Sequence, residues 1–66
     1  MNKTYWIIDN KQGDEFETRF EGTFEEAIQF AKDMYEGLTD HDKKLRDAFY
    51  VISDPDEEIE ECFEVI

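Results

Sequence analysis

Alternating apolar and polar positions predict a β-hairpin at the beginning of this chain. The run Thr4–Asp9 is rich in aromatic and β-branched residues, which favour strands. Because side chains in a strand alternate between its two faces, Trp6 and Ile8 are expected on one face and Tyr5 and Ile7 on the other. The first strand therefore has an apolar pair on each of its faces.

The second half of the predicted hairpin follows a turn over Asn10–Asp14, where Gly13 can adopt a positive φ. In Glu15–Glu21, charged residues alternate with Phe16, Thr18 and Phe20. This period of two predicts a strand that turns those three residues inward and its charged residues toward water.

A helix is predicted next, because Thr23 and Glu26 form a capping-box pattern and Gly37 is a natural C-cap. Between them, apolar residues recur at three- and four-residue spacing, which is typical of a helix lying on a sheet. The members of this apolar stripe are Phe24, Ala27, Ile28, Ala31, Met34 and Tyr35.

Two further strands are predicted in the rest of the chain, after a short helical turn that Thr39 caps. Ala48–Ser53 is the third strand, Asp54-Pro55-Asp56 is a turn, and Ile59–Ile66 is the fourth strand, with Ile59, Phe63 and Val65 on one face. The sequence thus predicts one α+β domain over residues 1–66, in the order ββαββ. We expect a four-stranded antiparallel or mixed sheet with one main helix packed on one face.

Charge is the most unusual property of this composition. The chain has 19 Asp and Glu against 7 Lys and Arg, a net charge of −12 in 66 residues. Its last 20 residues, 47–66, hold eight of the acids and no Lys or Arg. Such a field repels nucleic acid and anionic membranes and attracts basic surfaces. It also predicts a fold strained by self-repulsion, which added salt should stabilise.

The residue types that support catalysis are sparse, so we expect no enzyme. His41 is the only histidine and has no partner at a recognisable spacing, which favours an exposed loop residue. Cys62 is the only cysteine, excludes an internal disulfide, and is expected to be a buried or half-buried strand residue among acids. The acids around Asp54 do not match an EF-hand loop, so no metal or other cofactor is expected. The opening residues lack a signal-peptide pattern, which predicts a cytoplasmic protein.

The acids themselves are the candidate partner-binding residues. On exposed strand faces they are about 6.6 to 6.8 Å apart along a strand and about 4.8 Å apart between strands, which approaches the phosphate spacing of nucleic acid. The predicted set is Asp54, Asp56, Glu57, Glu58, Glu60, Glu61 and Glu64, with Glu15, Glu17 and Glu21 as a second row. Glu25, Asp33 and Glu36 on the predicted helix form a third row, and the strand order decides whether the rows join.

Two functions remain open at this point. The first is an inhibitor that binds the basic surface of a nucleic-acid-binding protein or nuclease, without binding nucleic acid itself. The alternative is a non-inhibitory interaction module or accessory subunit, with a homodimer through an exposed sheet edge as one form of it. In that case apolar residues such as Phe30, Tyr35 or Phe63 bind, and the acidity serves solubility.

A resemblance to known proteins adds to the first function. The segments Tyr5–Asp9, Thr23–Ile28, Leu38-Thr39 and Arg46–Val51 resemble short uncharacterised proteins of bacterial phages and mobile elements. In size and charge the chain is also similar to anti-CRISPR and anti-restriction proteins that mimic DNA. This resemblance implies an inhibitor of a nuclease or defence complex in the bacterial cytoplasm. It assigns no role to any single residue.

Overall fold

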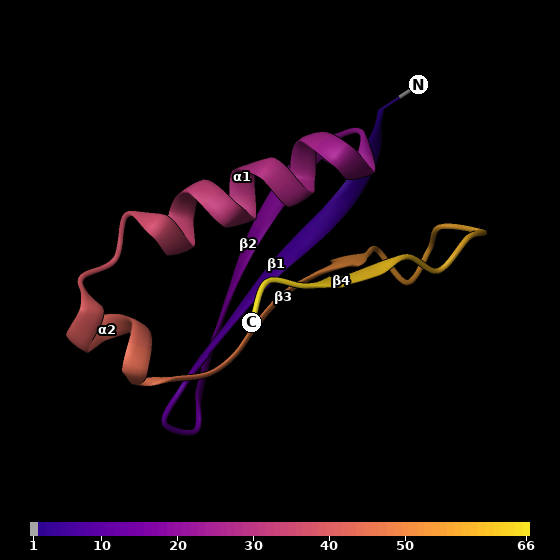
Figure 1. The fold of residues 1–66 in the computed structure, drawn as a ribbon. Coiled ribbons are helices and arrows are strands. Elements are labelled where there is room, and N and C mark those ends of the chain that lie inside the picture. Colours follow the sequence, from indigo (N-terminus) through magenta and orange to yellow (C-terminus); the bar gives the residue numbers. More distant parts are fainter. Residues whose placement is uncertain (1) are drawn as a thin grey trace.

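The protein folds as a four-stranded sheet with one main helix, as a computed structural model describes it for residues 2–66 (Figure 1). The elements follow one another as β1 (Lys3–Lys11), β2 (Asp14–Gly22), α1 (Phe24–Glu36), α2 (Asp40–Lys44), β3 (Arg46–Ser53) and β4 (Cys62–Glu64). This is the ββαββ order that the sequence predicts. All neighbouring strands are antiparallel, in the order β2-β1-β3-β4.

Strands β1 and β2 form a regular hairpin that is longer than the sequence pattern predicts. The register runs from Lys11 opposite Asp14 to Lys3 opposite Gly22. Only two residues, Gln12 and Gly13, make the turn, with φ of 50° and 89°. Two successive positive φ values are those of a type I′ turn, whose twist matches that of the flanking strands.

Helix α1 covers one face of the sheet and leaves the other face uncovered (Figure 1). The core lies between α1 and the two central strands. Its fully buried members come from all three elements: Tyr5, Ile7, Ala27, Ala31, Phe49 and Val51. The two alanines allow the helix to approach the sheet closely, and larger residues of the predicted stripe, such as Phe24 and Met34, pack around them.

Caps hold both helices as the sequence predicts. The Thr23 hydroxyl accepts a hydrogen bond from the Glu26 amide at 3.1 Å, and the Glu26 carboxylate accepts one from the Thr23 amide at 3.0 Å. At the other end of α1, the Gly37 amide donates to the Asp33 carbonyl at 3.1 Å. Thr39 caps α2 through the Asp42 amide at 3.1 Å.

An ion pair then fixes the end of α2 to the sheet. The Arg46 guanidinium donates to both carboxylate oxygens of Asp9, at 3.0 and 3.2 Å, and to the Asp42 carbonyl at 3.0 Å. Both side chains of the pair are largely buried, at 11% and 16% exposure. A bidentate pair of this kind sets the direction in which the chain enters β3.

One predicted strand boundary and one predicted inward position are wrong. The fourth strand is predicted to begin at Ile59, but β4 begins only at Cys62, and Ile59 is 61% exposed in the connection from β3. Phe16 is on the helix side of β2 but is 56% exposed, because it lies near the hairpin turn, beyond the residues that α1 covers. Phe63 and Val65, predicted on one face of that strand, are both half-buried, and Val65 packs against the core.

Within residues 2–66, neither helix has the length and apolar character needed to cross a membrane.

Candidate functional site

The candidate site is the sheet face opposite α1, which we call the open face. Because side chains alternate, the β1 residues beside the buried Tyr5 and Ile7 point to this face. Two rows of cross-strand neighbours define its centre. The first row is Arg19, Trp6, Ile52 and Cys62, and the second is Glu17, Ile8, Tyr50 and Glu64.

The rows show how apolar and acidic residues are distributed. The central strands contribute Trp6, Ile8, Tyr50 and Ile52, and of these Ile8 is only 3% exposed. The edge strands contribute the acids: in the second row, Glu17 lies at one end on β2 and Glu64 lies at the other end on β4. Three strand spacings separate these two carboxylates, or about 14 Å. The second row therefore has an apolar centre with an acid at each end, whereas the first row ends in Arg19 and Cys62.

Two shallow hollows lie on this face and adjoin each other. The smaller, of about 200 Å³, is lined by Trp6, Ile8, Glu17, Ile52 and Pro55. The larger, of about 420 Å³, shares Ile52 and Pro55 and follows the β3–β4 connection at the edge of this face, where Ser53, Asp54, Glu60, Glu61 and Cys62 also line it. Both hollows are open to solvent, which suits a flat or convex partner better than an enclosed small molecule.

The acidic connection from β3 to β4 is fixed to the open face by Asp54. Its carboxylate accepts a hydrogen bond from the Trp6 indole N–H at 2.8 Å and one from the Asp56 amide at 3.0 Å. Those two donors, the backbone amide first, hold the pKa of Asp54 below its usual range. Asp54 thus remains charged and positions Pro55 over the Trp6 edge of the hollow.

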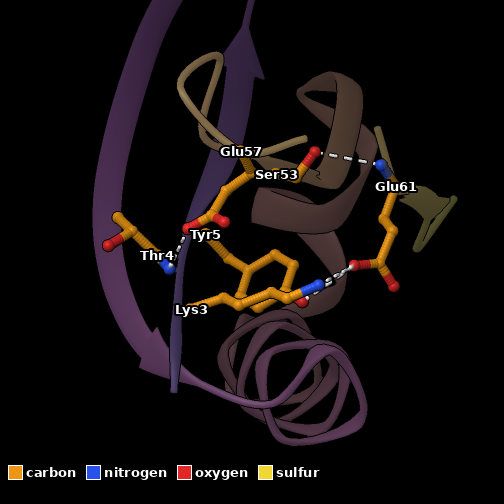
Figure 2. Close-up of polar contacts among 6 residues, drawn as sticks. All are labelled: Lys3, Thr4, Tyr5, Ser53, Glu57 and Glu61. Carbon is orange, nitrogen blue, oxygen red and sulfur yellow. Dashed lines mark hydrogen bonds and ion pairs between the residues drawn. The ribbon is translucent and has the colours of Figure 1, made fainter. Parts of the chain in front are cut away.

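Two other predicted acids, Glu57 and Glu61, make contacts inside the molecule instead. Figure 2 shows Glu61 beside Tyr5 and Lys3: its carboxylate accepts a hydrogen bond from the Tyr5 hydroxyl at 3.0 Å and lies 3.9 Å from the Lys3 ammonium. Its amide donates to the Ser53 hydroxyl at 2.9 Å. Burial, and then the Glu61 hydrogen bond, raise the pKa of Tyr5 to about 12.

Glu57 lies at the same end of the sheet, where its carboxylate accepts from the Thr4 amide at 3.4 Å (Figure 2). Glu57 and Glu61 therefore help to attach the β3–β4 connection to β1. Their carboxylates are less available to a partner than the exposed acids of the predicted set.

The remaining predicted acids are exposed in two places. Glu15, Glu17 and Glu21 lie on the open face of β2, and Glu64 lies on the same face of β4. Asp56, Glu58 and Glu60 lie in the β3–β4 connection. The structure thus places the β2 row and Glu64 on one face, with β1 and β3 between them, and leaves most of the first predicted row in the connection.

Positive charges concentrate on the helix side of the sheet. Lys3 lies near Glu61, Lys32 stands over the Phe63 ring at 5.2 Å, and Lys43 stands over the Tyr35 ring at 5.3 Å. Arg46 binds Asp9 on the same side. In the two rows defined above, Arg19 is the only base, and it forms an exposed ion pair with Glu21 at 2.7 Å.

The predicted burial of Cys62 is wrong: its thiol is free and exposed on the open face. β4 is an edge strand and no element covers this side of it, so a strand position there gives no burial. His41 is exposed, as predicted, but it lies in α2 rather than in a loop. Among residues 2–66, no group of three or more His, Cys, Asp and Glu side chains is placed to hold a metal ion.

The apolar centre was not predicted as part of the site. One helix can cover only one face of a sheet, so no helix covers the second apolar pair on β1, Trp6 and Ile8. This sequence feature could have identified Trp6 as a surface candidate, whereas neighbouring side chains on the open face bury Ile8 to 3% exposure.

Comparison with known protein families, with curated proteins and with solved structures finds no match to this chain.

Proposed function

We propose that this protein is a small acidic inhibitor that binds the basic surface of a nucleic-acid-binding protein through its open face. The observation that carries the proposal is the scarcity of bases on the open face. Exposed carboxylates lie on β2 and at Glu64 on β4, and Arg19 is the one base in the two rows, whereas in the helical layer exposed acids and bases lie together. A partner surface whose Lys and Arg residues bind nucleic-acid phosphates could pair here with the carboxylates of β2 and with Glu64 of β4.

The apolar centre supports a partner that is a protein. Trp6, Tyr50 and Ile52 provide aromatic and aliphatic area between the acids, and such residues commonly dominate binding energy at protein interfaces. The planar guanidinium of a partner's arginine can stack on an aromatic ring while it pairs with a nearby carboxylate. Nucleic acid itself would be repelled by a net charge of −12.

The same apolar centre favours a second candidate function, a non-inhibitory interaction module. In that case the apolar hollow around Trp6 and Ile52 would supply the binding free energy, and the acids would keep the small domain soluble. The two functions differ in salt dependence. The affinity of an interaction dominated by charge falls steeply with added salt, whereas the affinity of an apolar interaction changes little.

The experiment compares two variants with the same net charge. The face variant replaces Glu15, Glu17, Glu60 and Glu64 by Gln. The control variant replaces Glu25, Glu36, Asp33 and Asp40, all exposed in the helical layer, by Gln or Asn. Each immobilised protein is presented with the heparin-binding fraction of a bacterial lysate, with and without duplex DNA as competitor.

We expect the wild type and the control variant to capture nucleic-acid-binding proteins that DNA displaces, and the face variant to lose them. Equal capture by the two variants would mean that net charge alone is responsible and would remove the open face from the mechanism. Capture that duplex DNA does not affect would favour the interaction module.

A further inference from the structure

Strand β2 is a long edge strand whose outer side has no partner within the described fold. It has nine residues, and β1 is its one neighbour in the sheet. A long unpaired edge is a template for another strand. The other edge strand of the sheet, β4, has only three residues and so offers few unpaired backbone groups, whereas β2 offers a long row of them.

The hairpin geometry determines which β2 groups are free. In a two-residue hairpin, the pair beside the turn, here Lys11 and Asp14, shares backbone hydrogen bonds, and such pairs alternate along the strands. Residues 15, 17, 19 and 21 therefore direct their amides and carbonyls away from β1. The same alternation in β1 directs the Thr4 carbonyl toward β3, where it accepts from the Asp54 amide at 3.1 Å.

The sequence of β2 is complementary to itself about Thr18. When two copies of the strand run antiparallel with Thr18 opposite Thr18, Glu17 of each copy faces Arg19 of the other. Phe16 of each copy faces Phe20 of the other, and the residues with free backbone groups face one another. This register keeps both open faces on one side of the joined sheet, because odd positions pair with odd positions.

Exposed aromatic residues on the helix side fit the same arrangement. The Phe20 and Phe30 rings stack with centroids 5.0 Å apart, yet Phe30 is still 38% exposed. Phe16, on the same face of β2, is 56% exposed. In the Thr18-centred register, Phe16 of the second copy is placed beside the Phe20–Phe30 pair, which removes both exposed rings from water.

We infer that two copies of this protein associate through β2, antiparallel and centred on Thr18, to form one continuous eight-stranded sheet. The inference does not depend on the proposed function. Two features keep the association weak: Glu15 faces Glu21 of the second copy, and each chain carries −12. Because salt screens both repulsions, the dimer strengthens when NaCl is added, unlike the binding of a basic partner.

The first test is a charge-swap cycle followed by sedimentation equilibrium. The wild type is expected to show a monomer–dimer equilibrium with a dissociation constant on the order of 10 µM, as for a small interface. Glu17→Arg and Arg19→Glu each place like charges opposite each other twice, which weakens the dimer about tenfold. The double variant Glu17→Arg/Arg19→Glu exchanges the two charges and restores it. Glu25→Arg, on α1, leaves the dimer intact.

The second test is a disulfide across the proposed axis, which does not rely on the stability of the charge variants. In a Cys62→Ser background, Thr18→Cys brings two thiols together at a non-hydrogen-bonded pair, where Cα atoms are about 4.5 Å apart. Oxidised glutathione then converts this variant to a covalent dimer, whereas a cysteine at exposed Asp40 is expected to remain largely monomeric.

Three results would overturn the inference. The first is a wild type that sediments as a monomer at every concentration and salt. The second is a double variant that remains as weak as the single variants. The third is a Thr18→Cys thiol that cross-links no faster than the one at Asp40.

Discussion

The indole N–H of Trp6 donates a hydrogen bond of 2.8 Å to the Asp54 carboxylate, which joins residues 48 positions apart in the sequence. Tyr5, the neighbouring residue, donates from the opposite side of β1 to Glu61 at 3.0 Å. Consecutive residues of one central strand thus bind two acids of the β3–β4 connection, one on each face of the sheet. A connection rich in like charges is fixed in this way, because two of its acids each accept a hydrogen bond from a side chain of β1.

Asp54 should link stability to acidic pH. Its folded pKa is below the usual range, so its contribution is present above about pH 4 and is lost as the pH falls through the folded pKa. We expect Asp54→Asn to lower Tm at pH 7, and the difference from wild type to shrink as the pH falls below about 4. Thermal melts followed by the fluorescence of Trp6, the only tryptophan, measure both effects.

Asp56→Asn is the matched control for that variant. It removes the same charge from the same turn but leaves the Trp6 hydrogen bond in place. If Asp56→Asn lowers Tm as much as Asp54→Asn, or if the Asp54→Asn difference does not shrink at acidic pH, the contact between Asp54 and Trp6 is not responsible.

Tyr5 should make the fold sensitive to high pH. Its pKa is raised to about 12, so the stability it contributes is complete below about pH 10 and is lost as the pH rises through about 12. In an ultraviolet absorbance titration of the three tyrosines, we expect one to ionise near pH 12, and Tyr5→Phe to remove that step. Three overlapping transitions near pH 10 in the folded protein would contradict the buried, hydrogen-bonded phenol.

The Tyr5 hydroxyl also contributes to stability at neutral pH. Tyr5→Phe leaves the ring in the core and removes the hydrogen bond to Glu61, at a cost of about 1 kcal/mol. Chemical unfolding at pH 7 measures this, and Tyr35→Phe, which keeps the Tyr5 contact, serves as the control. An equal loss in both variants would indicate a general effect of tyrosine removal.

Arginine geometry should matter at Arg46 and not at Arg19. Arg46→Lys keeps the charge but loses the bidentate contact with Asp9 and the bond to Asp42, so we expect the free energy of unfolding to fall by about 2 kcal/mol. Arg19→Lys changes an exposed pair, with both side chains 60% exposed, and should cost less than about 0.5 kcal/mol. Urea denaturation compares the two variants directly, and similar losses would refute the assigned role of Arg46.

Added salt should raise the stability of the wild type. The chain carries 19 acids and 7 bases, and screening reduces their net repulsion in the folded state. We expect Tm to rise between low and moderate NaCl, with a smaller rise in the variant that replaces Glu15, Glu17, Glu60 and Glu64 by Gln. A wild-type Tm that stays constant or falls would show that self-repulsion does not limit the fold.

Local patterns predicted the elements because their periods are local properties. The alternation in β2 and the Thr23–Glu26 capping box identify a strand and a helix start without knowledge of their neighbours. The same patterns failed at Phe16 and Ile59, because burial depends on how far α1 and β4 extend. A strand pattern predicts which face a residue occupies, but not whether another element covers that face.

The candidate site was predictable in its composition and not in its arrangement. The acids of β2 and of the C-terminal third could be chosen from the sequence, but their separation across the sheet follows from the strand order β2-β1-β3-β4. Glu61 differs from its neighbours because Tyr5, 56 residues away in sequence, binds it. Contacts of that range cannot be derived from residue spacing along one segment.

Nuclear magnetic resonance of the labelled protein, titrated with a basic protein that it captures, tests the central claim most directly. The account predicts that the Trp6 indole signal and the amides of Ile8, Glu17 and Ile52 shift or broaden, whereas the exposed outer face of α1 changes little. Perturbations centred on α1, with the Trp6 indole unchanged, would contradict it.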